Sequence, residues 1–74
     1  MITEQKLNVT IGRNVQNLRK ENGWTTTEFA KKLKMSQAQV SRLENGRQGF
    51  RSIVLFRLAN VLKVSVTEIL KGLC

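Results

Sequence analysis

The side chains best suited to specific recognition lie close together near the middle of the chain, at Gln37, Ala38, Gln39 and Arg42. An amide can donate to and accept from adenine at the same time, and a guanidinium can form a paired hydrogen bond with the edge of guanine. The methyl group of alanine can pack against that of thymine. These residue types therefore predict contact with bases in the major groove of DNA, with Gln37 and Arg42 as the main readers.

Two of these side chains have a second interpretation. Gln39 follows Ser36 by the spacing of a capping box, in which the amide turns back toward the start of its helix instead of outward to a base. Ala38 is equally explained as a helix-forming residue that merely avoids a steric clash. The sequence leaves both alternatives open.

Helices must position these side chains, because apolar residues recur at helical spacing along almost the whole chain and proline is absent. Gly23 and Gly46 stand where helices should end. We expect an all-α fold without strands, preceded by an extended or frayed lead-in at residues 1–7. The expected helices span residues 8–22 (beginning at Asn8 or Val9), 26–33, 37–45, 52–62 and 66–71.

Capping signals support these boundaries. The capping-box pattern occurs before three of the helices, at Thr25 with Glu28, Ser36 with Gln39 and Ser65 with Glu68. The helix at 52–62 has Ser52 or the loop before it as its cap. The helix at 37–45 offers little to a core beyond Val40 and Leu43, so most of its surface should face outward.

The composition excludes several classes of function. The 74 residues include 13 Lys and Arg against five Glu and no Asp, a net charge of +8, which favours a polyanionic partner. Histidine is absent and the acidic residues are scattered, so neither a metal site nor an acid-base pair can be assembled. We expect one small domain over residues 1–74 that is not an enzyme and holds no metal or cofactor.

The expected cellular location follows from the lack of long apolar segments and of paired cysteines in the sequence. No segment is apolar over the length that a signal peptide or a membrane span needs. The single cysteine, Cys74, cannot form an intrachain disulfide, and we expect a terminal thiol without function. These features predict a cytoplasmic protein with no membrane partner and no evident small-molecule effector.

A concerted pattern runs through LRKENGWTTTEFAKKLKMSQAQVSRLENG, residues 18–46, and continues in LFRLANVLKVSVTEIL, residues 55–70. From Ile11 to Leu70 the chain resembles the lambda-repressor-like family, the Cro or phage-repressor type of helix-turn-helix protein. The resemblance implies a compact five-helix domain whose recognition helix, at about 37–45, enters the major groove. It also implies a sequence-specific transcriptional regulator that binds a roughly palindromic DNA operator as a homodimer.

The resemblance assigns further roles. It implies a partly buried, structural ion pair between Arg19 and Glu44. Thr26 stands where the family commonly has a phosphate-binding Gln, and Lys34 and Lys63 stand where it commonly has Gly. Contacts to the DNA backbone are expected from Thr25, Thr26, Thr27, Lys34, Ser36, Ser41, Asn45 and Arg47.

Apolar residues left over from the inward face of the helix at 52–62 suggest how two copies would pair. A single recognition helix reads too few base pairs to find one site, so such proteins usually bind two half-sites as dimers. The surplus consists of Ile53, Val54, Val61 and, near the last helix, Val66. The alternative is that Ile53 or Val54 simply completes the core.

A different class of function remains open. A small helical domain of this type can also be an antitoxin or another protein-interaction module whose main partner is a protein. Such a protein would bind its partner through the helix at 52–62 or through the N-terminal segment.

Overall fold

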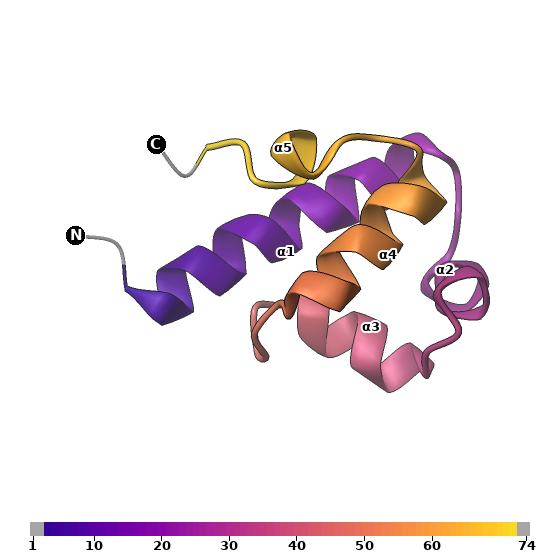
Figure 1. The fold of residues 1–74 in the computed structure, drawn as a ribbon. Helices are drawn as coiled ribbons and strands as arrows, with labels where there is room; N and C mark the ends of the chain where they lie inside the picture. Colours follow the sequence, from indigo (N-terminus) through magenta and orange to yellow (C-terminus); the bar gives the residue numbers. More distant parts are fainter. Residues whose placement is uncertain (1–2, 73–74) are drawn as a thin grey trace.

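A computed structural model describes residues 3–72, and these residues fold into helices without a strand. The five helices are α1 (Glu4–Glu21), α2 (Thr26–Leu33), α3 (Gln37–Glu44), α4 (Ser52–Leu62) and α5 (Val66–Ile69). The expected all-α class and the number of helices are confirmed. In Figure 1, the long helix α1 lies beneath α5, α3 forms the lower edge, and α4 crosses between them. Cys74 lies outside the described residues.

The first helix begins earlier than the sequence pattern suggests. Thr3 is its N-cap, and the Thr3 side chain accepts a hydrogen bond from the Lys6 backbone N–H at 3.1 Å. Glu4 lies in the first turn, where a negative charge is favourable, and Leu7 packs against the core. The expected lead-in at 1–7 is therefore wrong for Glu4–Leu7, because one cap and one apolar contact extend the helix beyond its strongly periodic part.

Helices α2 and α3 begin where their capping boxes predict. At α2, the Thr25 N–H donates to the Glu28 carboxylate at 3.0 Å, and the Glu28 N–H donates to the Thr25 hydroxyl at 3.1 Å. Ser36 and Gln39 form the same reciprocal pair at the start of α3. Both starts are set by contacts within four residues, which is why the sequence predicts them.

Helix α4 spans the expected residues, and α5 is shorter than expected. The N-cap of α4 is Arg51, in the loop before the helix, which was one of the two expected alternatives; it makes no side-chain cap bond, and Ser52 is not the cap. At α5 only half of the expected capping box forms: Ser65 accepts from the Glu68 N–H at 3.4 Å, but the Glu68 carboxylate pairs with Lys71 at 3.2 Å. Helix α5 ends at Ile69 instead of residue 71, and the backbone oxygens of Ile69 and Lys71 accept from the Asn14 amide.

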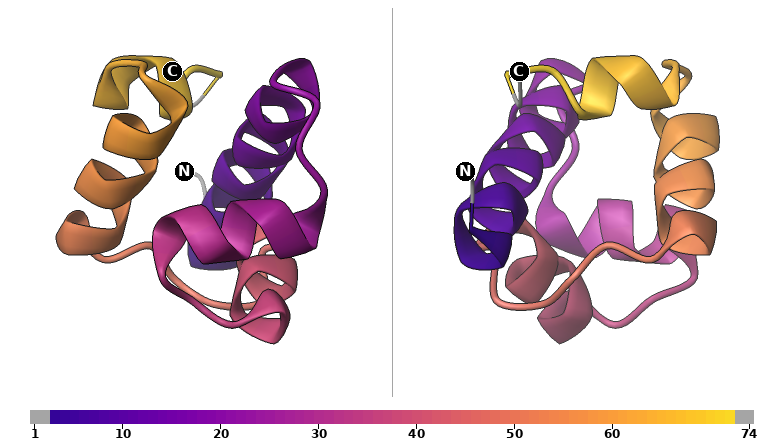
Figure 2. Two further views of the ribbon diagram at one scale, coloured as in Figure 1. Left: turned by 90° about the vertical axis from the view of Figure 1, so that its right-hand side faces the viewer. Right: turned by 60° about the vertical axis from the view of Figure 1, so that its left-hand side comes forward.

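The core lies where the inward faces of all five helices meet, and Figure 2 shows the helices enclosing it. Trp24, between α1 and α2, is half-buried and stacks on Phe29 with ring centroids 5.9 Å apart. The buried apolar residues of this cluster are Ile11, Val15, Leu18, Phe29, Ala30, Leu33, Val40, Leu58, Leu62 and Ile69. All of these residues belong to the apolar pattern at helical spacing from which the helices were predicted.

Helices α1 and α3 cross in direct backbone contact at Gly12. A Cβ atom at Gly12 would lie 2.8 Å from the Glu44 carbonyl oxygen and closer still to that of Leu43. The crossing therefore requires a residue without a side chain, which sequence periodicity alone does not reveal. On the other side of α1, the Asn14 amide donates to the backbone oxygens of Ile69 and Lys71 at 2.8 and 2.7 Å and holds α5 in place.

Candidate nucleic-acid interface

A three-residue turn, Lys34–Ser36, joins α2 to α3. Lys34 has left-handed backbone angles (φ 57°), and the Met35 N–H donates back to the Ala30 oxygen of α2 at 3.0 Å. Met35 also packs against the core. These contacts fix the two helices against each other and present the start of both at one side of the molecule.

The outward side of α3 carries most of the expected base-reading residues. Val40, Leu43 and Glu44 are buried, whereas Gln37, Ala38, Ser41 and Arg42 are exposed. In Figure 1, α3 forms the lower edge of the bundle, and no other helix is drawn below it. The fold thus brings Gln37, Ala38 and Arg42 to the surface together.

Gln37 is held by the start of the preceding helix. Its Nε2 atom donates to the Thr26 hydroxyl at 3.0 Å. An amide has a second N–H and an acceptor oxygen, so this bond leaves a donor and an acceptor for a base. Thr26 stands where the family commonly has Gln. It therefore holds Gln37, one of the two side chains that are expected to contact bases.

Gln39 takes the capping role, the second of its two expected roles, in this structure. Its Oε1 atom accepts from the Ser36 N–H at 2.9 Å and lies 3.3 Å from the Ser36 hydroxyl. The side chain is turned back along the helix, so contact with a base requires the cap to open. We therefore treat Gln39 mainly as a capping residue.

Arg42 has a partner that the sequence did not indicate. The Arg42 Nε atom donates to the Gln48 side-chain oxygen at 3.2 Å. Gln48 lies in the loop after α3 and is half-buried, although Arg42 itself is exposed. Periodicity assigns no role to a loop residue, so only the tertiary fold identifies this contact.

The start of α2 offers backbone donors to an anion. The Thr25 N–H is bonded to Glu28, while those of Thr26 and Thr27 belong to the first helical turn and have no hydrogen-bond partner among residues 3–72. Hydrogen bonds from Thr25 lower the pKa of the Glu28 carboxyl, and the nearby charges of α2 lower it further. This carboxylate is thus held ionised in its cap.

The remaining candidates for backbone contacts border α3. Asn45 donates through its side chain to the Ser41 backbone oxygen at 2.8 Å, so these two residues are already linked. Arg47 is exposed and lines an open pocket of about 520 Å³ beside the first turns of α1. Lys34 and Ser36 are exposed at the turn. Ser41 lies on α3 itself, and the other four lie on the segments before and after it. They flank the exposed face of α3, which we call the reading surface and which consists of Gln37, Ala38, Ser41 and Arg42.

A buried ion pair fixes the far end of α3 to α1. Arg19 and Glu44 are 8% and 7% exposed, and Nε of the arginine lies 2.7 Å from Oε2 of the glutamate. A second bond joins NH2 to Oε1 at 3.2 Å, and NH1 donates to the Trp24 oxygen at 2.8 Å. The structure therefore contains the ion pair implied by the family pattern, in bidentate geometry.

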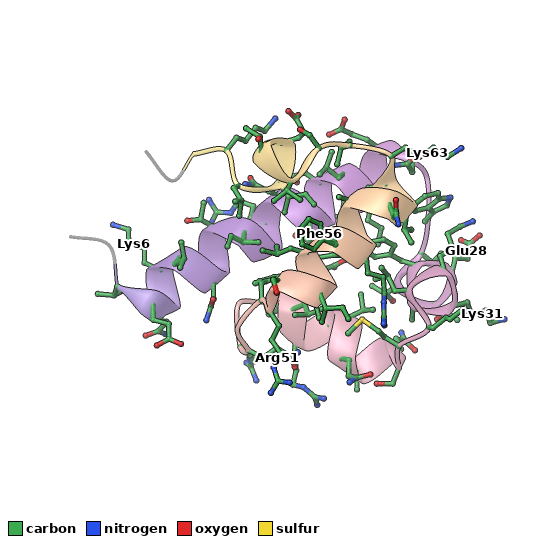
Figure 3. The ribbon with its side chains drawn as sticks, in the orientation of Figure 1. Lys6, Glu28, Lys31, Arg51, Phe56 and Lys63 are labelled. Atoms are coloured by element: carbon green, nitrogen blue, oxygen red, sulfur yellow. The ribbon has the colours of Figure 1, made fainter. Side chains whose placement is uncertain are left out.

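The outer face of α4 differs from the expected apolar patch. Ile53 is 63% exposed, but Val54 and Val61 are half-buried and pack against the core. The sequence interpretation did not name Phe56, which is 66% exposed and lies one turn after Ile53 (Figure 3). Residues three apart share a helix face, so spacing alone could have identified this pair. Val66, at the start of α5, is half-buried.

The described residues limit other kinds of site. No helix among residues 3–72 is long and apolar enough to cross a membrane. Within the same residues no three His, Cys, Asp or Glu side chains gather where they could hold a metal ion.

The α2–turn–α3 unit, with a polar outward face on its second helix, defines a helix-turn-helix protein. The chain belongs to the helix-turn-helix family HTH_3, whose sequence model matches residues 15–69. The matched region contains α2, α3, α4 and α5 and the second half of α1.

Similar proteins include a named repressor and a named antitoxin from bacteria. The chain is 42% identical over 59 residues to a competence pilus inhibition repressor of Acinetobacter baylyi, covering 80% of this chain and 54% of the relative. It is 36% identical over 50 residues to the antitoxin HipB of Escherichia coli, covering 68% and 57%. The chain thus spans about half the length of these two relatives.

A similar solved structure is the clp gene regulator ClgR from C. glutamicum. It matches with a TM-score of 0.82 and 30% sequence identity, covering 86% of this chain and 83% of that one. The fold of the whole bundle, beyond the helix-turn-helix unit, is therefore that of known regulators.

Proposed function

We propose that this chain is a sequence-specific, double-stranded-DNA-binding transcriptional regulator that places α3 in the major groove. The observation that carries the proposal is the outward face of α3, where Gln37 and Arg42 are exposed and each is oriented by a residue outside the helix. Such amide and guanidinium groups are the side chains that read adenine and guanine. The similarity to a named repressor supports the same conclusion.

The segments around α3 are suited to binding the sugar-phosphate backbone. The free N–H groups at the start of α2 form an anion site, and Lys34, Asn45 and Arg47 lie at either end of α3. The net charge of +8 adds long-range attraction for DNA. In the proposed complex, phosphate contacts set the orientation of the domain on DNA, and α3 selects the base sequence.

Pairing of two copies would complete the site. Ile53 and Phe56 form an exposed apolar pair on α4, which we define as the α4 patch. Large apolar side chains exposed side by side on a small domain favour association. We propose that the chain binds a roughly palindromic operator as a homodimer joined through this patch, which replaces the broader patch expected from the sequence.

Gln37→Ala tests base reading. We expect binding to the preferred DNA site to weaken by about 1–3 kcal/mol, with little change in binding to unrelated DNA, because the variant loses a base contact and keeps the residues that contact phosphates. The preferred site is first obtained by selecting bound sequences from random DNA, and affinities are then measured by titration on both DNAs. Arg47→Ala is the control and should weaken both. Equal losses for Gln37→Ala on the two DNAs would contradict base reading.

Comparing Lys34→Gly with Lys63→Gly separates the effect of each lysine on the free energy of unfolding from its effect on DNA binding. Both lysines have left-handed backbone angles, φ 57° and 58°, so each variant should gain about 0.5–1 kcal/mol of unfolding free energy. Lys63 lies at the end of α4 away from α3 (Figure 3), so Lys63→Gly should bind DNA almost as the parent does. Lys34→Gly should lose affinity and reduce the salt slope by about one. Matched salt slopes for the two variants would exclude a phosphate contact by Lys34.

Phe56→Asp tests the α4 patch. Because Phe56 is exposed, the substitution should leave the monomer folded, abolish the dimer in sedimentation equilibrium, and remove the preference for two half-sites over one. Asn17→Asp, on the exposed side of α1, adds the same charge elsewhere and should change neither result. A dimer that survives Phe56→Asp would place the interface on another face.

One observation favours a second function. One relative is named an antitoxin, which agrees with the alternative that this chain is an antitoxin whose main partner is a protein. The α4 patch would then bind that partner instead of a second copy. Failure to enrich any sequence from random DNA would favour this alternative over the proposed regulator.

A further inference from the structure

The loop that follows α3 lies beside that helix at Gln48. This residue is half-buried and lines an open pocket of about 630 Å³ with Gln39, the first turns of α1 and the apolar side chains of Met35 and Phe50. Gln48 therefore lies where its side chain can support one from α3.

Arg42 contacts this support through one particular donor. Its Nε–H is bonded to the Gln48 side-chain oxygen at 3.2 Å. A guanidinium has five N–H donors in a planar fork, so the two terminal NH₂ groups remain available. Those groups form an end-on pair of parallel donors, which matches the O6 and N7 acceptors of guanine.

The hydrogen bond between Arg42 and Gln48 also lowers the entropy cost of binding a base. A free arginine side chain has many rotamers, and ordering them on binding opposes affinity. The amide of Gln48 orients the guanidinium without neutralising its charge, whereas a carboxylate at this position would orient it, neutralise it and repel phosphates. The neutral acceptor thus suits a support for a base reader.

We propose that Gln48 is a specificity-determining positioning residue, which holds Arg42 with its two NH₂ groups directed at a guanine. The inference rests on the proposed function, since Arg42 must read DNA for its orientation to matter. It assigns part of the sequence preference to a loop outside the helix-turn-helix unit. Gln37 and Thr26 are linked in the same manner at the other end of α3.

The test compares the sequences that full-length variants select from random DNA. Arg42→Ala should lose the preference at one base position of the parental consensus. Gln48→Met, which keeps the size of the side chain and removes its acceptor oxygen, should lower the preference at that same position roughly fivefold to tenfold. The double variant should lose no more than Arg42→Ala, because the two residues act as a unit. Gln48→Glu keeps an acceptor oxygen and should retain guanine at that position with weaker overall affinity.

Controls separate the possible failures. Arg47→Ala, at the neighbouring residue, should weaken binding without changing any base preference, and equal thermal midpoints should show that Gln48→Met is folded. If the parent selects no sequence, the proposed function fails and this inference falls with it. If the parent selects a site and Arg42→Ala loses one position, but Gln48→Met keeps that position, only the role of Gln48 is overturned. An unchanged preference in Arg42→Ala would overturn it as well.

Discussion

Glu44→Ala is expected to lower the free energy of unfolding by about 3–5 kcal/mol, the largest effect of any single substitution considered for this chain. The variant strands the guanidinium of Arg19, which is only 8% exposed and loses both of its bonds to the carboxylate. Small domains have about 5–15 kcal/mol of total stability, so much of the variant should be unfolded at moderate temperature. Urea unfolding followed by circular dichroism measures the change.

An exposed ion pair provides the matched control. Glu68 and Lys71 lie 3.2 Å apart with side chains 47% and 64% exposed, so Glu68→Ala should cost less than about 1 kcal/mol. The double variant Arg19→Met with Glu44→Leu removes both buried charges and should be more stable than Glu44→Ala. Similar losses of unfolding free energy for Glu44→Ala and Glu68→Ala would mean that the pair between Arg19 and Glu44 is effectively solvated.

Gly12→Ala is expected to destabilise the chain by about 2–3 kcal/mol, although alanine is the better helix former. The gain in helix propensity is about 1 kcal/mol. Against it, the new methyl group would lie 2.8 Å from the Glu44 oxygen and closer to that of Leu43, and both are backbone atoms that yield only if α3 moves. Steric overlap at the α1–α3 crossing should therefore outweigh the gain.

Gly49→Ala tests whether the steric contact is the cause. A Cβ atom at Gly49 meets nothing within 4 Å, and its φ angle is not positive, so this substitution should change the unfolding free energy by less than about 0.5 kcal/mol. Thermal and urea unfolding of both variants give the comparison. A neutral or stabilising Gly12→Ala would show that α1 and α3 separate at little cost.

Both predictions concern how α3 is held for its proposed role. Gly12 lets the end of α3 approach α1, and the bond between Arg19 and Glu44 fixes that end. Partial loss of either contact should allow α3 to tilt, and small misplacements of reading side chains weaken specific contacts more than phosphate contacts. We therefore expect the ion pair to support the proposed recognition through the position of α3, without contacting DNA itself.

The amino-acid sequence alone predicted the elements whose causes are local. Helices α2 and α3 begin at Thr26 and Gln37 because side chains three residues apart exchange hydrogen bonds with the backbone, and such signals can be identified in the sequence. The inward stripes follow from helical spacing in the same manner. The start of α1 was missed because Thr3 is a single cap without the reciprocal Glu or Gln.

Contacts between segments far apart in the sequence could not be predicted from capping patterns or periodicity. The crossing at Gly12, the support of Arg42 by Gln48 and the burial of Val54 and Val61 depend on how the helices pack in three dimensions. Packing also left Ile53 and Phe56 outward on α4. Local hydrogen bonds and periodicity thus specified which helices form, whereas tertiary packing determined which side chains of α3 and α4 stay exposed and which residues contact them.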